Sequence, residues 1–266
     1  MIVRFVATWH AGMMARRSAE ETREIILRAG LKLLLERGPT AGVQHIRLQE
    51  VLRTVGLSTG AAYRIWADQT DFHRDLATEM VRLRFAPPAA SVNSAVGDIL
   101  ARGGGIDEVI RAGALDHVKY ATLMHEDPDS RDTHAFLTAL SLRASAGAWP
   151  ELREASVARH VESVDEFVEF YSAVLAHYGR RMRTPFTLRQ FAEAMAALGE
   201  GFAIRGAEGM DHPMVDIADV DEGPTGYWTL FGLTVRALID MFTVEDPAIT
   251  QSDAHGQMAP DRVGGT

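Results

Sequence analysis

The segment from Ile46 to Phe72 constrains the fold more than any other part of the chain. It reads IRLQEVLRTVGLSTGAAYRIWADQTDF. Apolar residues recur in its first third at spacings of three and four, which predicts a helix over 46–54. Gly56 follows, and glycine adopts the left-handed conformation of a sharp turn without steric cost. The pattern therefore predicts two short helices joined by a tight turn.

The second of these helices, predicted over 59–66, begins with small residues that allow its backbone to approach another surface closely. Ser58 stands where a side-chain hydroxyl can cap the helix. Tyr63, one turn further on, can reach a phosphate or a thymine methyl group. Asp68 is placed to cap a following helix, predicted over 68–85.

A longer helix is predicted before the turn, over residues 18–37. Ser18 and Glu21 have the spacing of a capping box, and Gly38-Pro39 ends the helical pattern. Together these helices predict a small helix-turn-helix head at the N-terminal end.

The order of Gly56, small residues, Tyr63 and Trp66 resembles the DNA-binding signature of the TetR family of one-component transcriptional regulators. The resemblance covers about residues 20–72. It implies a recognition helix that enters the major groove of DNA, while Trp66 is better explained as a core residue.

Three positions depart from the family pattern. This chain has Arg47, Ile65 and Gln69 where the family usually has a threonine, a histidine and a phosphate-contacting lysine. Arg47 could supply the missing positive charge. The residues expected to contact DNA are Arg47, Ser58, Thr59, Gly60, Tyr63, Arg64 and Gln69.

The remainder of the chain shows helical apolar stripes and no alternating β-branched runs. Helices are predicted over 107–125, 130–145, 151–181, 187–205 and 225–243. The predicted fold class is all-α, with a three-helix helix-turn-helix head and a helical C-terminal ligand-binding and dimerisation domain. The predicted division is 1–15 as a disordered or mis-annotated start, 16–85 as the DNA-binding domain, 86–105 as a linker, 106–244 as the helical domain and 245–266 as a disordered tail.

The TetR resemblance implies that the last two helices pair with those of a second subunit in a four-helix bundle. The apolar residues of these helices are interleaved with small ones, which permits close helix packing. The predicted interface residues are Phe191, Met195, Leu198, Phe202, Trp228, Phe231, Val235 and Leu238.

A small-molecule pocket needs apolar walls with a few placed polar groups. Several aromatic and histidine side chains on the C-terminal helices fit that description, although core packing explains each of them equally well. The predicted ligand-binding residues are His117, Tyr120, Trp149, Phe170, Tyr171 and His177.

The charge is distributed unevenly along the chain. Residues 13–85 carry twelve Lys or Arg against nine Asp or Glu, whereas residues 86–266 carry fourteen against twenty-seven. A mildly basic head on an acidic body is typical of a DNA-binding protein with a separate regulatory domain. An ordinary acidic protein with chance local variation is the alternative.

Other classes of protein find little support in the sequence. There is no nucleophile elbow, phosphate loop or HExxH motif, so no enzyme is indicated. No cofactor is implied, and no two histidines of the predicted helices have metal-ligand spacing. The chain has no cysteine, which fits a reducing cytoplasm, and no apolar run long enough to span a membrane.

The sequence therefore predicts a cytoplasmic, homodimeric transcriptional regulator, by family habit a repressor. Its expected partners are a near-palindromic double-stranded DNA operator and an unidentified small-molecule effector. The alternative is a helical ligand-binding or protein-interaction module that no longer binds DNA.

Overall fold

A computed structural model describes residues 17–40, 42–83, 96–217 and 226–246 of the chain. The predicted N-terminal start (1–15), the first half of the predicted linker (86–95) and nearly all of the predicted tail lie outside these residues. Helices dominate the described part, which confirms the all-α prediction. No helix within it is long and apolar enough to cross a membrane.

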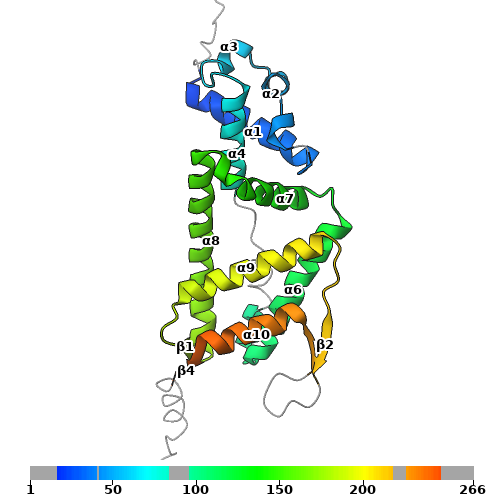
Figure 1. The fold of residues 1–266 in the computed structure, drawn as a ribbon, viewed down its shortest axis with the longest axis vertical. Helices are drawn as coiled ribbons and strands as arrows, with labels where there is room; N and C mark the ends of the chain where they lie inside the picture. Colours follow the sequence, from blue (N-terminus) through cyan, green and yellow to red (C-terminus); the bar gives the residue numbers. More distant parts are fainter. Residues whose placement is uncertain (1–16, 41, 84–95, 218–225, 247–266) are drawn as a thin grey trace, which may run out of the picture.

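The helices form a head and a body (Figure 1). The head contains α1 (Ala19–Arg37), α2 (Leu48–Val55), α3 (Thr59–Ala62) and α4 (Gln69–Arg82). The body contains α6 (Ile106–Glu126), α7 (Arg131–Ala144), α8 (Pro150–His177), α9 (Leu188–Ala207) and α10 (Leu230–Phe242). Short 3-10 turns lie at Val43–His45 and Ala146–Ala148.

Helix ends in the head follow local capping chemistry. Ser18 and Glu21 form the predicted capping box on α1, and the Asp68 carboxylate accepts the backbone N–H groups of Thr70 and Asp71 at the start of α4. Gly56 ends α2 in the left-handed conformation, at φ 65° and ψ 32°. These three predictions are confirmed.

The recognition helix is shorter than predicted. α3 ends at Ala62 instead of Trp66, because the N–H groups of Ile65 and Trp66 both bond to the Ala62 carbonyl and the chain turns there. Ser58 occupies the N-cap position, but its side chain makes no capping hydrogen bond. Both sequence expectations are therefore corrected.

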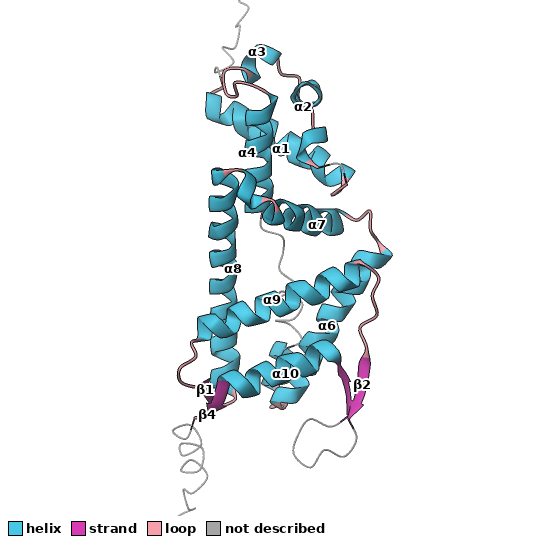
Figure 2. Cartoon of the chain, in the orientation of Figure 1, coloured by secondary structure: helices cyan, strands magenta, loops and turns pink. Residues whose placement is uncertain are grey.

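Four short strands in the body contradict the prediction that this part is helical throughout (Figure 2). β1 (Arg180–Met182) pairs antiparallel with β4 (Thr243–Glu245), and β2 (Met214–Ile217) pairs antiparallel with β3 (Gly226–Thr229). Segments of three or four residues are too short to produce a detectable alternation. As a result, α8 ends at His177 and α10 begins only at Leu230.

The core of the head extends into the start of the body. Ile26 of α1, Val51 of α2 and Phe72 of α4 are fully buried together, and Leu152 at the start of α8 belongs to the same cluster. His134 of α7 also reaches the head, since its Nδ1 lies 2.6 Å from the carbonyl oxygen of Leu35. The division into domains at residue 85 remains a prediction.

Gly56 provides a direct stability test of the turn. A Cβ at this position would meet no atom within 4 Å, so only the left-handed backbone conformation opposes a side chain. Gly56→Ala is expected to lower the free energy of unfolding by about 1 kcal/mol, and Gly56→Asn by less, because asparagine tolerates this conformation. Urea denaturation followed by circular dichroism measures both. Equal stability of Gly56→Ala and the parent protein would contradict the assigned turn.

Candidate nucleic-acid interface

The turn between α2 and α3 is closed by backbone hydrogen bonds. The N–H of Leu57 donates to the Leu52 carbonyl at 3.0 Å, which folds the chain back at Gly56. Ala62 is fully buried on the inner side of α3, so the residues around it face outward. The turn thus sets α3 at the outer end of the head (Figure 1).

Trp66 anchors the segment that follows α3. Its side chain is 3% exposed and meets the ring of Phe72 edge to face at 5.3 Å. The indole Nε1–H donates to Asp75 of α4 at 2.8 Å, and the same carboxylate oxygen accepts Nε–H of Arg23 from α1 at 3.0 Å. Trp66 is therefore a core residue, as expected.

Gln69, unlike the other predicted DNA contacts, is half-buried and hydrogen-bonded within the head. Its carbonyl oxygen accepts the backbone N–H of Leu48 at 3.0 Å, and its amide nitrogen donates to the Ile46 carbonyl at 3.0 Å. The first N–H groups of a helix lack intrahelical partners, and Arg47 provides no side-chain cap for α2. The Gln69 amide supplies that cap from 21 residues away, which no local sequence signal could indicate.

The other predicted contacts lie on the surface of the head. All of them are exposed to solvent, and Tyr63 is 55% exposed. Most lie on α3 or next to it, whereas Arg47 precedes α2. The exposed set is Arg47, Ser58, Thr59, Gly60, Tyr63 and Arg64. None of these side chains is needed for the core of the head.

The six predicted ligand-binding residues do not surround one cavity. Trp149 packs against the head-side core, Tyr120 against the cluster of Ala121 and Met124, and His177 is exposed. Phe170 and Tyr171 meet edge to face at 5.3 Å but pack into different clusters. Sequence periodicity places residues on a helix face, but it does not say which faces meet.

His117 is the member of that set with unusual chemistry. Its ring stacks on Phe231 with centroids 4.3 Å apart, and its buried Nε2 has no hydrogen-bond partner. Burial, together with the charge of nearby His212, lowers the pKa of His117 from 6.5 to about 4. A backbone hydrogen bond at Gly199 acts in the opposite direction.

His212 completes this polar cluster, which sequence analysis did not find. Both ring nitrogens of His212 are buried without hydrogen-bond partners. The His212 ring stacks on Phe202 of α9 at 5.8 Å, and Phe202 in turn meets Phe231 at 5.2 Å. The cluster brings unsatisfied polar atoms and aromatic rings together between α6, α9 and α10, which is the chemistry of a small-molecule site.

The predicted interface residues are mostly interior. Five of the eight are buried in the core of their own chain, while the other three are half-buried. The buried residues are Phe191, Met195, Trp228, Phe231 and Val235, and the half-buried ones are Leu198, Phe202 and Leu238. The outward faces of α9 and α10 carry different residues, among them Ala197, Gly201, Leu230, Ala237 and Met241.

Comparison with known proteins reveals likeness at the level of structure. A protein assigned to the TetR family from a Rhodococcus species has a TM-score of 0.42 at 18% identity, covering 72% of this chain and 90% of its own. A TetR-family protein from Vibrio parahaemolyticus has a TM-score of 0.42 at 16% identity, covering 84% and 100%. NalD of Pseudomonas aeruginosa, the secondary repressor of the MexAB-OprM multidrug efflux pump, has a TM-score of 0.39 at 22% identity, covering 71% and 87%.

At the level of sequence, no protein-family model and no curated protein matches the chain. The chain resembles the TetR family of transcriptional regulators in its helix-turn-helix signature and its all-α fold.

The buried state of His117 predicts a specific loss of stability in acid. Below pH 6.5 the unfolded chain binds a proton at this residue, whereas the folded chain does so only near pH 4, so stability falls as pH decreases through this range. His117→Asn is expected to reduce the loss between pH 7 and pH 4.5 by about 2 kcal/mol.

Urea denaturation at each pH measures this difference. His177→Asn is the matched control, because His177 is exposed. If the parent protein and His117→Asn lost equal stability between pH 7 and pH 4.5, the conclusion that the folded protein keeps His117 neutral would be wrong.

Proposed function

We propose that the protein is a homodimeric one-component transcriptional regulator, acting as a repressor whose affinity for DNA responds to a small molecule. The observation that carries this proposal is the surface around α3. Thr59, Gly60 and Tyr63 are exposed there, while Ala62 and Trp66 hold the same segment in the core. Such a surface is available for a partner without loss of the fold.

Each exposed residue suits a role at DNA. A Cβ on Gly60 would meet nothing within 4 Å, so this stretch of backbone can approach another molecule closely. Tyr63 offers a hydroxyl and an aromatic ring, and the exposed arginines at positions 47 and 64 can contact phosphates. Arginine contacts to phosphate supply affinity that falls with salt, whereas contacts to base edges supply specificity.

A dimer would place two such heads on one operator. Helix-turn-helix dimers read half-sites one helical turn apart, about 34–36 Å, so a near-palindromic operator is expected. The exposed faces of α9 and α10 support such pairing, since Leu230, Ala237 and Met241 follow one side of α10. Ala197 and Gly201 on α9 are small enough for close helix approach.

The effector is proposed to bind at the cluster of His117 and His212, beside the rings of Phe202 and Phe231. A ligand that satisfies their buried polar atoms would favour whichever conformation leaves room for it. It changes DNA affinity only if it binds the two conformations with different affinity. The hydrogen bond from His134 of α7 to Leu35 of α1 connects the body to the head and offers a route for this coupling.

A second candidate function is a helical ligand-binding or protein-interaction module that does not bind DNA. One observation favours it: the Gln69 amide is engaged in capping α2, at a position where the TetR family usually has a lysine for phosphate. DNA affinity separates the two proposals.

DNA binding is tested by fluorescence anisotropy with DNA flanking the gene, across a salt series. Tyr63→Ala is expected to weaken binding about tenfold, since it removes a contact worth about 1–1.5 kcal/mol. Gly60→Ala is expected to weaken DNA binding as well, but to raise thermal stability slightly, because alanine favours a helix more than glycine does.

Weaker DNA binding together with higher thermal stability in Gly60→Ala would show that the variant loses contact with DNA and not its fold. Scrambled DNA is the control for specificity, and a random-sequence selection covers an operator located elsewhere. A folded dimer that selects no sequence at any salt concentration would reject the regulator proposal in favour of the second candidate.

Dimerisation is tested on the outward face of α10. Ala237→Glu places a charge on this exposed apolar face and is expected to convert the dimer to a monomer, as measured by light scattering during gel filtration. Ala173→Glu on α8 is the matched control at another exposed alanine. An unchanged dimer mass in Ala237→Glu would exclude this face.

A further inference from the structure

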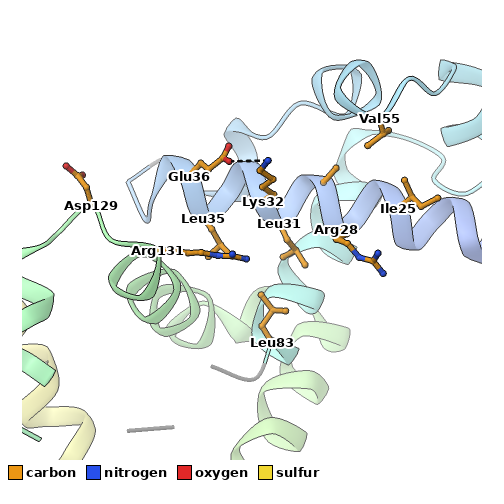
Figure 3. A pocket seen from close by; sticks show the side chains of 11 residues that line it. Ile25, Arg28, Leu31, Lys32, Leu35, Glu36, Val55, Leu83, Asp129 and Arg131 are labelled. Atoms are coloured by element: carbon orange, nitrogen blue, oxygen red, sulfur yellow. Dashed lines mark ion pairs between the residues drawn. The ribbon is translucent and has the colours of Figure 1, made fainter. Parts of the chain in front are cut away.

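A second site lies where the head meets the body. An open groove of about 740 Å³ runs between α1, the ends of α2 and α4, and the start of α7 (Figure 3). This volume falls within the range of small-molecule sites. It is separate from the cluster around His117, and none of the residues predicted to bind ligand lines it.

Most of the groove wall is apolar. Ile25, Leu31 and Leu35 contribute it from α1, and Val55 and Leu83 add to it from the ends of α2 and α4. Covering such a surface with an apolar chain or ring is favourable at about 25 cal/mol per Å². The groove therefore suits the apolar part of a ligand.

The polar part of that ligand is indicated by the charges at the groove. Arg28, Lys32 and Arg131 line it in a chain of net charge −9. Two of these cations have intrahelical partners: Arg28 lies 2.7 Å from Glu24, and Lys32 lies 3.7 Å from Glu36 (Figure 3).

Arg131 differs from both. It has no ion pair among the described residues, and it is the first residue of α7, where the positive end of the helix dipole disfavours a cation. Its side chain extends from α7 toward α1 (Figure 3). Asp129 also lines the groove, but its carboxylate is 97% exposed and lies 3.9 Å from Nε2 of His134 instead of pairing with Arg131. An anionic group at Arg131 would relieve the unfavourable charge and gain strong hydrogen bonds from the guanidinium.

We infer that this groove binds an amphiphilic carboxylate, with its apolar part against α1 and its carboxylate on Arg131. A molecule bound there contacts α1 and α4 of the head and α7 of the body together. It therefore holds the head in the orientation that the structure shows. The binding site does not depend on the proposed DNA-binding function, so the two can fail separately.

Affinity and charge preference are tested by calorimetry with dodecanoate below its micellar range, beside dodecan-1-ol and dodecyltrimethylammonium. Dodecanoate is expected to bind most tightly. Arg131→Gln is expected to weaken dodecanoate about tenfold and to leave the alcohol unchanged. Lys119→Gln removes an exposed cation of α6 outside the groove and serves as the matched control.

Location is tested by thiol protection, because the chain has no cysteine of its own. Ala29 lines the groove, and Ala29→Cys is expected to react with N-ethylmaleimide about tenfold more slowly when dodecanoate is present at ten times its dissociation constant. Ala173→Cys on α8 should show no protection. Circular dichroism verifies that each variant is folded.

Three results would overturn the inference. These are absence of dodecanoate binding, equally tight binding of the cationic amphiphile, and binding without protection of Ala29→Cys. The last would place the ligand elsewhere, for example at the His117 cluster. DNA binding enters none of these measurements.

Discussion

The geometry of the head depends on the hydrogen bonds that the Asp75 carboxylate accepts. One of its oxygens accepts both the Trp66 indole N–H and the Arg23 guanidinium, so that α1, α4 and the segment after α3 meet at one atom. α3 has only four residues, and a helix of that length has little stability of its own. Its position is therefore imposed from both sides, by the turn at Gly56 before it and by the buried Trp66 after it. A surface that must meet DNA in one orientation gains from being held in this way.

Helix α8 provides the mechanical link between head and body. Leu152 near its start is buried in the core of the head, whereas Leu175 near its end belongs to the core of the body. With 28 residues it spans about 42 Å, so a displacement of either end is transmitted to the other. α7 adds a second connection through His134 and the Leu35 carbonyl. Both links bypass residues 84–95, so the head and body communicate by packing as well as through the chain.

Local features of the head could be predicted from sequence because their causes lie within a few residues. The capping box at Ser18, the left-handed turn at Gly56 and the cap at Asp68 each depend on one side chain and its neighbours. The Gln69 cap on α2 could not be predicted, since its partners at positions 46 and 48 are distant in sequence. The DNA contacts remain predictions, although all except Gln69 lie on the exposed surface of the head.

In the body, the sequence predicted helices better than it predicted contacts between them. Apolar stripes identified α6 to α10 approximately, but His117 proved to face His212 in a loop, and Tyr171 proved to pack on Phe191. Which helix faces meet depends on the whole fold, and this also explains why the predicted interface residues lie in the core. The β1–β4 pair escaped detection for a related reason, because pairing between residues 180–182 and 243–245 joins segments separated by two helices.

The pairing of β1 with β4 has a consequence for how the molecule comes apart. It fastens the end of α10 to the end of α8, and the backbone N–H of Asp246 donates to the Gly179 carbonyl at 2.7 Å beside it. Helices α9 and α10 are thereby closed into a loop whose two ends are held together, so neither helix can fray outward from its attached end alone. Segments coupled in this way tend to exchange their amide hydrogens in a single cooperative opening. Helices α9 and α10 are therefore expected to open as one unit, in which α10 retains its protection for as long as β1 and β4 remain paired.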